Sequence, residues 1–329
     1  MKQKTKSNLL LLTAAFIWGS AFVAQKIGGD IGAMTFNCVR NIIGGLFLIP
    51  VAYLFYLKQN SSSGREAVQG SGKADPEEKI KYRKNLITGG FFCGMALFAA
   101  STLQQVSLET ASAGRAGFIT SLYAVLVPVL SIILGRRVKP VIWLCVAVGV
   151  AGLYLLSSDT GKFRLNSGDV MLMISSLLYA VHILIIDHYT PLVDGVQLSC
   201  VQFLFAGTFG LAPMFVLEDP SVTALLQGWI PLLYTGVLSS GIAYTCQIVG
   251  LKGADPSEAS LILCLESVFS MITGMIVLHE TMPLRGYIGC LLIFIAVASA
   301  QVLPDKISAR RNGVREKIAD GAKQPDSMR

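Results

Sequence analysis

Ten long apolar runs constrain this chain more than any other feature. Each run is close to the length of about 20 residues that a helix needs to cross a bilayer. Only five charged residues fall within the runs, namely Arg40, Arg115, Glu258, Glu266 and Arg285. The sequence therefore predicts an all-α polytopic membrane protein with ten transmembrane helices, at approximately 8–25, 32–57, 85–106, 113–134, 140–157, 170–186, 195–217, 226–251, 257–278 and 284–303.

The composition excludes most other classes of protein. Hydrophobic residues make up 53% of the 329, and charged residues make up 14%, against about 25% charged in a soluble domain. A soluble enzyme, a disordered chain and a disulfide scaffold are therefore poor interpretations. The seven cysteines all fall within predicted spans and, like the three histidines, show no metal-ligand spacing. We expect no metal and no cofactor.

Lysine and arginine are distributed unevenly over the predicted loops. With the N-terminus in the cytoplasm, 21 of the 27 basic residues lie on the cytoplasmic side, four lie on the other side and two lie inside helices. Cytoplasmic loops of membrane proteins carry such an excess. We therefore expect a protein of the cell membrane with both termini in the cytoplasm. The net charge of +7 is then an orientation signal, and no nucleic acid partner is needed to explain it.

An internal repeat relates the two halves of the chain. A shift of 143 places Ala116 on Ala259, Leu122 on Leu265 and Pro140 on Pro283, and a shift of 162 places Cys38 and Val39 on Cys200 and Val201. These matches predict two inverted repeats of five helices, because an odd number of spans per half turns the second half upside down. We expect a first repeat at 1–157 with a cytoplasmic loop at 58–84, a second repeat at 158–303 and a basic cytoplasmic tail at 304–329.

Several short motifs also carry a family resemblance. The chain resembles the EamA family of the drug/metabolite transporter superfamily over roughly residues 8–303. The residues that carry the resemblance are Trp18 to Phe22 with Lys26, Arg40, Gly117 to Tyr123 leading to Val127 and Pro128, and Leu265 to Phe269 with Glu280 and Thr281.

This resemblance implies a fold and a class of substrate. It implies a substrate cavity formed by every span except 140–157 and 284–303, which would lie at the edge as a surface for a homodimer. The substrates of the family include amino acids, other metabolites and drugs. The chain departs from the common pattern at Arg137, where many members have glutamate. It also departs at Ser267, where many have proline, and we expect this change to remove a kink from the span 257–278.

Two charges are predicted to lie deep in the membrane. Glu266 is the tenth residue of its predicted span, about 14 Å from the start at 1.5 Å per residue. A charge at that depth costs at least about 2.5–3.5 kcal/mol and usually faces a cavity or a partner. Glu266 could carry a proton during transport or balance a cationic substrate. It could instead form an ion pair or stay a neutral carboxylic acid that is hydrogen-bonded between helices. Arg40 cannot lose its charge, so it needs an anionic partner, a substrate carboxylate or a ring of carbonyls. Glu266 could itself be the anionic partner.

Aromatic and amide side chains are predicted to surround these two charges. Aromatic faces and amides suit a cavity that binds an organic molecule weakly enough to release it. His182 could also relay protons. Together with Glu266 and Arg40, the predicted substrate-binding residues are Trp18, Tyr123, Tyr179, His182, Tyr244 and Gln247, with Phe22, Gln104, Gln105 and Gln202 in the wider set.

The function that these features favour is secondary transport of a small organic metabolite by alternating access. Two alternatives remain open. A membrane-embedded enzyme would need an acidic metal or diphosphate cluster, or a nucleophile and a base, and a sensor or scaffold would need an output domain. We expect a small-molecule substrate and the lipid bilayer as partners, a proton gradient or the substrate gradient as the energy source, and no catalytic residue.

Overall fold

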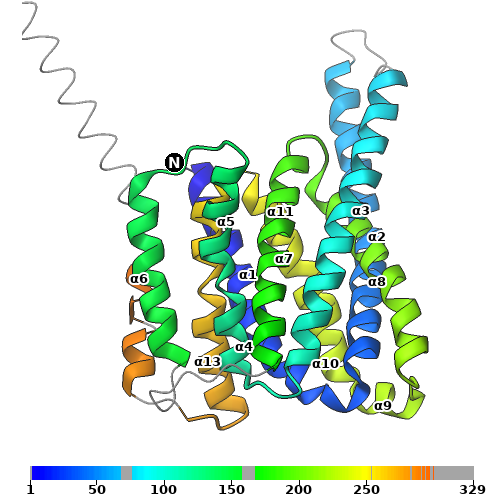
Figure 1. Cartoon of the computed structure of the whole chain (residues 1–329). Helices are drawn as coiled ribbons and strands as arrows, with labels where there is room; N and C mark the ends of the chain where they lie inside the picture. The colour runs from blue at the N-terminus through cyan, green and yellow to red at the C-terminus, as the bar shows by residue number, and fades with distance from the viewer. Residues whose placement is uncertain are drawn as a thin grey trace, which may run out of the picture.

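The computed structural model describes residues 2–67, 76–157, 167–252 and 254–281 without interruption, and parts of 284–299. All the regular structure in these residues is helical. Figure 1 shows helices that run nearly side by side, so that the chain forms one bundle. The cytoplasmic tail predicted at 304–329 and the residues Cys290 and Ala300 lie outside the described residues.

Eight stretches of the described structure are long and apolar enough to cross a membrane. The chain is therefore an integral membrane protein. Shorter apolar helices at Pro140–Gly152 and Leu284–Ala296 occupy the positions of the fifth and tenth predicted spans. The elements in chain order are α1 (Lys2–Ile27), η1 (Gly29–Ile31), α2 (Ala33–Ala67), α3 (Pro76–Ser107), α4 (Ala113–Thr120), α5 (Tyr123–Ile133), α6 (Pro140–Ser157), α7 (Ser167–Tyr189), α8 (Gly195–Leu217), α9 (Val222–Gln227), α10 (Trp229–Leu233), η2 (Tyr234–Ala243), α11 (Tyr244–Leu251), α12 (Pro256–Leu263) and α13 (Glu266–Val277).

The region 58–84, which we expected to be a loop, is partly helical. Helix α2 continues to Ala67 and α3 begins at Pro76, and Figure 1 shows the two helices rising together beyond the rest of the bundle. The start of α3 follows local rules, because Pro76 lacks the amide hydrogen that a first turn leaves unused, and Glu77 and Glu78 favour a helix N-terminus. Predicted membrane boundaries and helix boundaries therefore differ here.

Two spans are interrupted in their middle. The span 113–133 is divided into α4 and α5, and the span 256–277 is divided into α12 and α13. At the first break the Ser121 hydroxyl donates to the carbonyl of Gly117 at 2.8 Å. At the second break the Ser267 hydroxyl donates to the carbonyl of Cys264 at 2.7 Å. The expectation that Ser267 in place of proline would remove the kink from this span was wrong, because the span is interrupted at this point. A serine hydroxyl that donates to a backbone carbonyl of the preceding turn can bend a helix without proline.

A third span contains a π-helix. The segment η2 joins α10 to α11 inside the stretch Trp229–Leu251. The hydroxyl of Thr235 donates to the carbonyl of Pro231 at 2.7 Å near its start. Segments of π-helix are rare and are often found at functional sites. This one widens the turn that faces α2 and α1 at the centre of the bundle.

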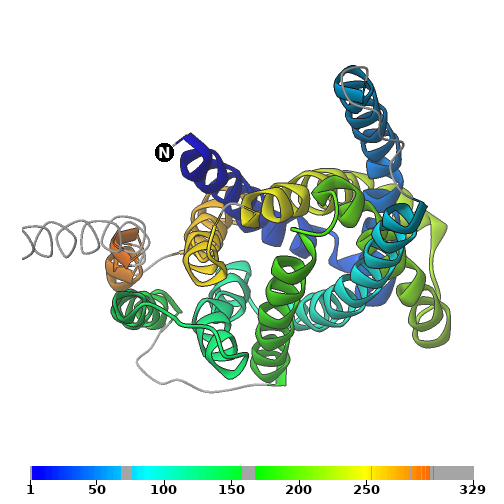
Figure 2. The same ribbon diagram turned by 90° about the horizontal axis from the view of Figure 1, so that it is seen from above.

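Close helix contacts at glycine hold the two halves together. Helices α2 and α8 approach so closely that a side chain on Gly207 would lie 3.2 Å from the backbone nitrogen of Ile42. At one edge of the bundle, seen from above in Figure 2, α6 stands beside the helix of residues 284–296. A Cβ on Gly149 would lie 3.7 Å from the Cβ of Ala296. The contact between these two helices is therefore made within one chain.

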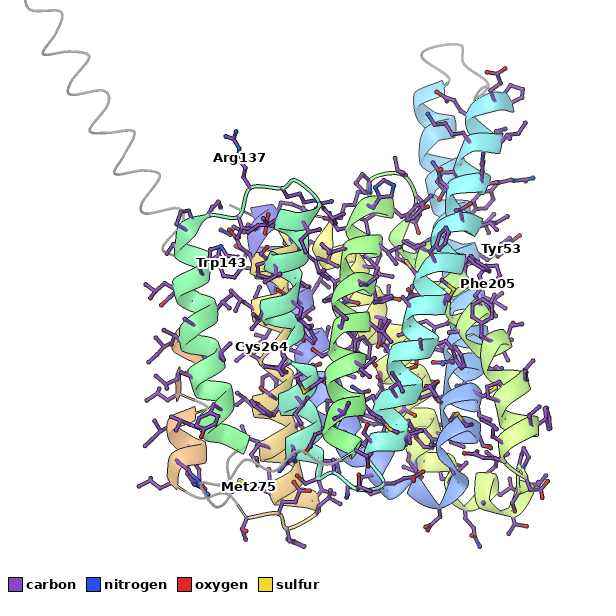
Figure 3. The ribbon with its side chains drawn as sticks, viewed as in Figure 1. Tyr53, Arg137, Trp143, Phe205, Cys264 and Met275 are labelled. Carbon is purple, nitrogen blue, oxygen red and sulfur yellow. The ribbon has the colours of Figure 1, made fainter. Side chains whose placement is uncertain are left out.

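Two charged residues near helix ends, Arg115 and Glu258, form ion pairs within the protein. The guanidinium of Arg115 binds Asp169 through two contacts of 2.7 Å, and the side chain of Asp169 is fully buried. Glu258 lies 2.9 Å from the ammonium of Lys139 and 3.8 Å from that of Lys4. Charges with a partner within the protein are stabilised there and need not extend to the surface. Arg137, by contrast, projects away from the bundle (Figure 3).

Candidate functional site

A cavity lies at the centre of the bundle. It is formed where α1, α2, α3 and α7 meet the interrupted spans and η2. Seven of the eight predicted substrate-binding residues line it. The full set of lining residues is Trp18, Ala21, Phe22, Gln25, Arg40, Gln104, Thr120, Tyr123, Tyr179, Ile183, Ser239, Tyr244, Gln247 and Glu266.

The interrupted spans place two of these residues at equivalent positions. Tyr123 is the first residue of α5 and Glu266 is the first residue of α13. Glu266 is 3% exposed, and it accepts a long hydrogen bond of 3.4 Å from the hydroxyl of Ser121. The Tyr123 hydroxyl interacts electrostatically with Glu266, and it has no hydrogen-bond partner in the part of the chain that the structure describes. The carboxyl group is thus buried with only weak protein partners.

Arg40 enters the cavity from α2. Its Nε donates to Oδ1 of Asn37 at 3.0 Å, and Asn37 in turn donates to the hydroxyl of Thr102 at 2.8 Å. In the described ranges no carboxylate lies within ion-pair distance of its guanidinium. Arg40 and Glu266 therefore face the cavity separately and do not neutralise each other by direct contact.

Aromatic rings make up much of the remaining wall. The ring centroids of Trp18 and Tyr244 lie 4.5 Å apart at an angle of 59°. The hydroxyl of Tyr179 donates to Oε1 of Gln104 at 3.2 Å, which fixes that ring against α3. Rings held in this way offer flat apolar faces to an organic molecule and to a cation.

His182, which we predicted to bind substrate, is not among the residues that line this cavity. Its Nε2 lies 3.0 Å from Oε1 of Gln202 on α8, and its side chain is completely buried. The ring of Tyr244 lies on one side of it, with the centroids 5.9 Å apart. The imidazole therefore faces α8 from behind the aromatic wall, where an amide partner satisfies one of its nitrogens.

The sequence interpretation missed five lining residues: Ala21, Gln25, Thr120, Ile183 and Ser239. A signal for two of them was present. Trp18, Ala21, Phe22 and Gln25 follow the three- and four-residue spacing of one helix face. Once Trp18 was assigned to the cavity, that spacing would also have assigned Ala21 and Gln25.

Four polar atoms at this cavity have no hydrogen-bond partner among the residues described, although they are buried. They are Nε1 of Trp18, Oε1 of Gln25, the hydroxyl of Tyr123 and Oε1 of Gln247. Leaving one buried polar group unsatisfied costs about 1–3 kcal/mol. A group of donors and acceptors in this state at one cavity favours occupancy by water or by a polar ligand.

Comparisons with known proteins agree over most of the chain. A model described as the EamA-like transporter family matches residues 5–158 and 166–300. A protein from Archaeoglobus fulgidus named an uncharacterized transporter is 30% identical over 295 residues, which cover 88% of this chain and 84% of that protein. The uncharacterized transporter YoaV of Bacillus subtilis is 23% identical over 297 residues, which cover 88% and 94%.

A solved structure shares the fold. One crystal structure superposes with a TM-score of 0.72 and covers 92% of this chain and 99% of its own. Its sequence identity of 17% supports a common arrangement of helices and nothing more specific.

Proposed function

This chain belongs to the EamA-like transporter family, and on that premise we propose that it is a secondary transporter that moves a small organic metabolite by alternating access. The observation that carries the proposal is the central cavity, which combines aromatic faces, amides and two separate buried charges. The relatives named as transporters support a transport function and fit a protein that is not an enzyme. The substrate is proposed to be an amino acid, a related metabolite or a drug.

Alternating access is supported by pairs of features related by the same shift of 143. Tyr123 and Glu266 both begin a half-helix at the cavity. Arg115 and Glu258 both lie in the first turn of the preceding half-helix, and each pairs with a residue near the start of a long helix, Asp169 in α7 or Lys4 in α1. These pairs support ten helices in two inverted repeats at 1–157 and 158–303, a geometry that gives one site two alternative openings.

Three finer features are part of the same proposal. Both termini are proposed to be cytoplasmic, because the lysines and arginines favour that side. A proton gradient is proposed as one source of energy, through Glu266. A homodimer through α6 and the helix of 284–296 is proposed because Ala147 and Ala151 remain exposed on α6.

The test of transport has two stages. Metabolites inside and outside cells with and without the protein are compared first, and each metabolite that differs is then followed in liposomes that contain the purified protein. We expect at least one metabolite to show protein-dependent flux. No flux across a broad panel would contradict the proposal.

Glu266→Gln tests the proton role in the same liposomes. We expect flux to fall and to lose its dependence on pH, because glutamine keeps the shape of the side chain but cannot gain or lose a proton. Glu78→Gln is the matched control, since Glu78 is exposed at the start of α3. Unchanged flux with unchanged pH dependence in Glu266→Gln would remove the proton-carrier role.

A further inference from the structure

A second, smaller pocket continues the central cavity along α1. Gln25 belongs to the wall of both cavities. The second pocket lies where α1 ends, beside the turn that follows α3. Its lining residues are Gln25, Lys26, Gly29, Ala33, Gln105, Leu108 and Glu109.

We call this second pocket the outer pocket, and hydrogen bonds hold the backbone around it in place. The ammonium of Lys26 donates to the carbonyl of Ala111 at 2.7 Å and to that of Leu108 at 3.3 Å. These contacts fix the end of α1 to the turn after α3 across more than 80 residues of chain. The pocket is therefore bounded by anchored backbone, and the ammonium that borders it is already occupied.

The boundary between the two cavities is weakly held. Nε2 of Gln25 donates within its own helix to Ala21 at 3.2 Å, and Nε2 of Gln105 reaches the carbonyl of Gln25 at 3.5 Å. Both side chains are 3% exposed, and Oε1 of each has no partner in the described structure. Rotation of these two amides would cost one weak hydrogen bond each.

The opposite side of the central cavity is closed by a much thicker barrier. Leu11, Ala14 and Ala15, which precede Trp18 on α1, are completely buried. A side chain on Gly250 of α11 would lie 2.9 Å from Leu11, so the two helices leave no space between them. The ion pairs of Glu258 with Lys4 and Lys139 lie beyond these residues. The short connection from the central cavity thus leads to the outer pocket.

We propose that the outer pocket is a second substrate-binding subsite on the transport path, and that Gln25 and Gln105 form the gate between it and the central cavity. The proposal rests on the proposed transport function. Because both Nε2 groups are bonded, the free amide atoms are oxygens, and Glu109 adds a carboxylate. This arrangement of acceptors would bind a part of the substrate that donates hydrogen bonds, such as an ammonium or hydroxyl group.

Reaction of introduced cysteines with a membrane-impermeant methanethiosulfonate tests the gate. The positions are Gly29→Cys in the outer pocket, where a Cβ would meet nothing within 4 Å, Ala21→Cys in the central cavity, and Ala14→Cys in the thick barrier. The trimethylammonium-ethyl reagent is added to each face of the membrane in turn. The unsubstituted protein measures the reaction of the native cysteines.

We expect Gly29→Cys to react fastest, and only from the face at which α1 ends, with Ala21→Cys slower and Ala14→Cys at background. Adding Gln25→Ala should speed the reaction of Ala21→Cys by about threefold to tenfold, since a hydrogen bond and a blocking side chain are lost together. Gln105→Ala is the second variant and should act in the same direction. An unchanged rate in both, or reaction of Ala21→Cys only from the opposite face, would overturn the gate.

The chemistry of the subsite is tested by a second reagent. Aminoethyl methanethiosulfonate carries the same charge as the trimethylammonium reagent but can donate hydrogen bonds. At each position we divide the rate of the aminoethyl reagent by the rate of the trimethylammonium reagent. We expect this ratio to be larger at Gly29→Cys than at Thr223→Cys, an exposed reference position on α9. Equal ratios at the two positions would overturn the proposal that the outer pocket binds hydrogen-bond donors. These rates need no transported substrate, so they are decided separately from the flux experiment.

Discussion

Gly19 is a position at which a single methyl group should disturb the bundle. A Cβ there would lie 2.7 Å from the carbonyl oxygen of Glu266 and 2.8 Å from the backbone nitrogen of Ser270. Backbone cannot rotate aside as a side chain can. We expect Gly19→Ala to destabilise the protein by about 1–3 kcal/mol, as overpacking of a full interior does.

The measurement is the midpoint of thermal unfolding in detergent. Gly29→Ala is the control, because a Cβ at Gly29 would meet nothing within 4 Å. Equal midpoints for the two variants would show that α1 and α13 can separate without cost, against the packing described above.

Individual site residues could be predicted where a charged or polar side chain lies inside an apolar run of the sequence. Arg40 and Glu266 stand out in apolar runs, and both line the cavity. His182 also conflicts with its surroundings, but its partner Gln202 lies on another helix and could not be identified from sequence distance. Gln25 was missed because a glutamine near the end of a predicted span resembles an ordinary boundary residue.

At the scale of elements, helix positions followed from hydropathy, whereas their interruptions did not. The breaks at 121–122 and 264–265 lie inside runs that hydropathy predicts as single spans, and the residues of the π-helix have no composition that distinguishes them from an α-helical span. These features depend on where hydroxyl groups such as those of Ser121 and Ser267 find carbonyls. The hydropathy of a residue does not specify which of several nearby carbonyls its side chain will bind.

The ion pair between Arg115 of α4 and Asp169 of α7 should be the strongest in the described part of the bundle. Arg115 meets Asp169 in a two-contact geometry, and Asp169 is fully buried. Breaking a buried pair from one side commonly costs about 3–5 kcal/mol. We expect Asp169→Asn to lower the midpoint of thermal unfolding strongly.

Asp187→Asn is the matched control for that variant. Asp187 pairs with Arg136, whose side chain is 41% exposed, and exposed pairs contribute about 0–1 kcal/mol. Thermal unfolding of both variants in the same detergent measures the difference. An equally large loss of stability in Asp187→Asn and Asp169→Asn would contradict the argument that the buried ion pair stabilises the protein more than the exposed one.

At the scale of the whole molecule, the proposed inverted arrangement predicts on which side of the membrane each loop lies. Ten spans and a cytoplasmic N-terminus place the C-terminus in the cytoplasm and residues 158–166 on the other side. A fluorescent protein that matures only in the cytoplasm should be bright at the C-terminus and dark in 158–166. Alkaline phosphatase, which is active only outside, should give the reverse pattern, and any other result would contradict the count of ten.

Among the residues that the structure describes, no carboxylate lies within ion-pair distance of Arg40, and this separation has an electrical consequence. In alternating access the site stays in place while the barrier moves from one side of it to the other, so the voltage drop across the membrane moves past Arg40. One elementary charge across 100 mV corresponds to about 2.3 kcal/mol, and part of that energy would act on the conformational change itself. Whenever Glu266 in the same cavity is protonated and does not balance it, a fixed arginine would make turnover sensitive to membrane potential even for an uncharged cargo.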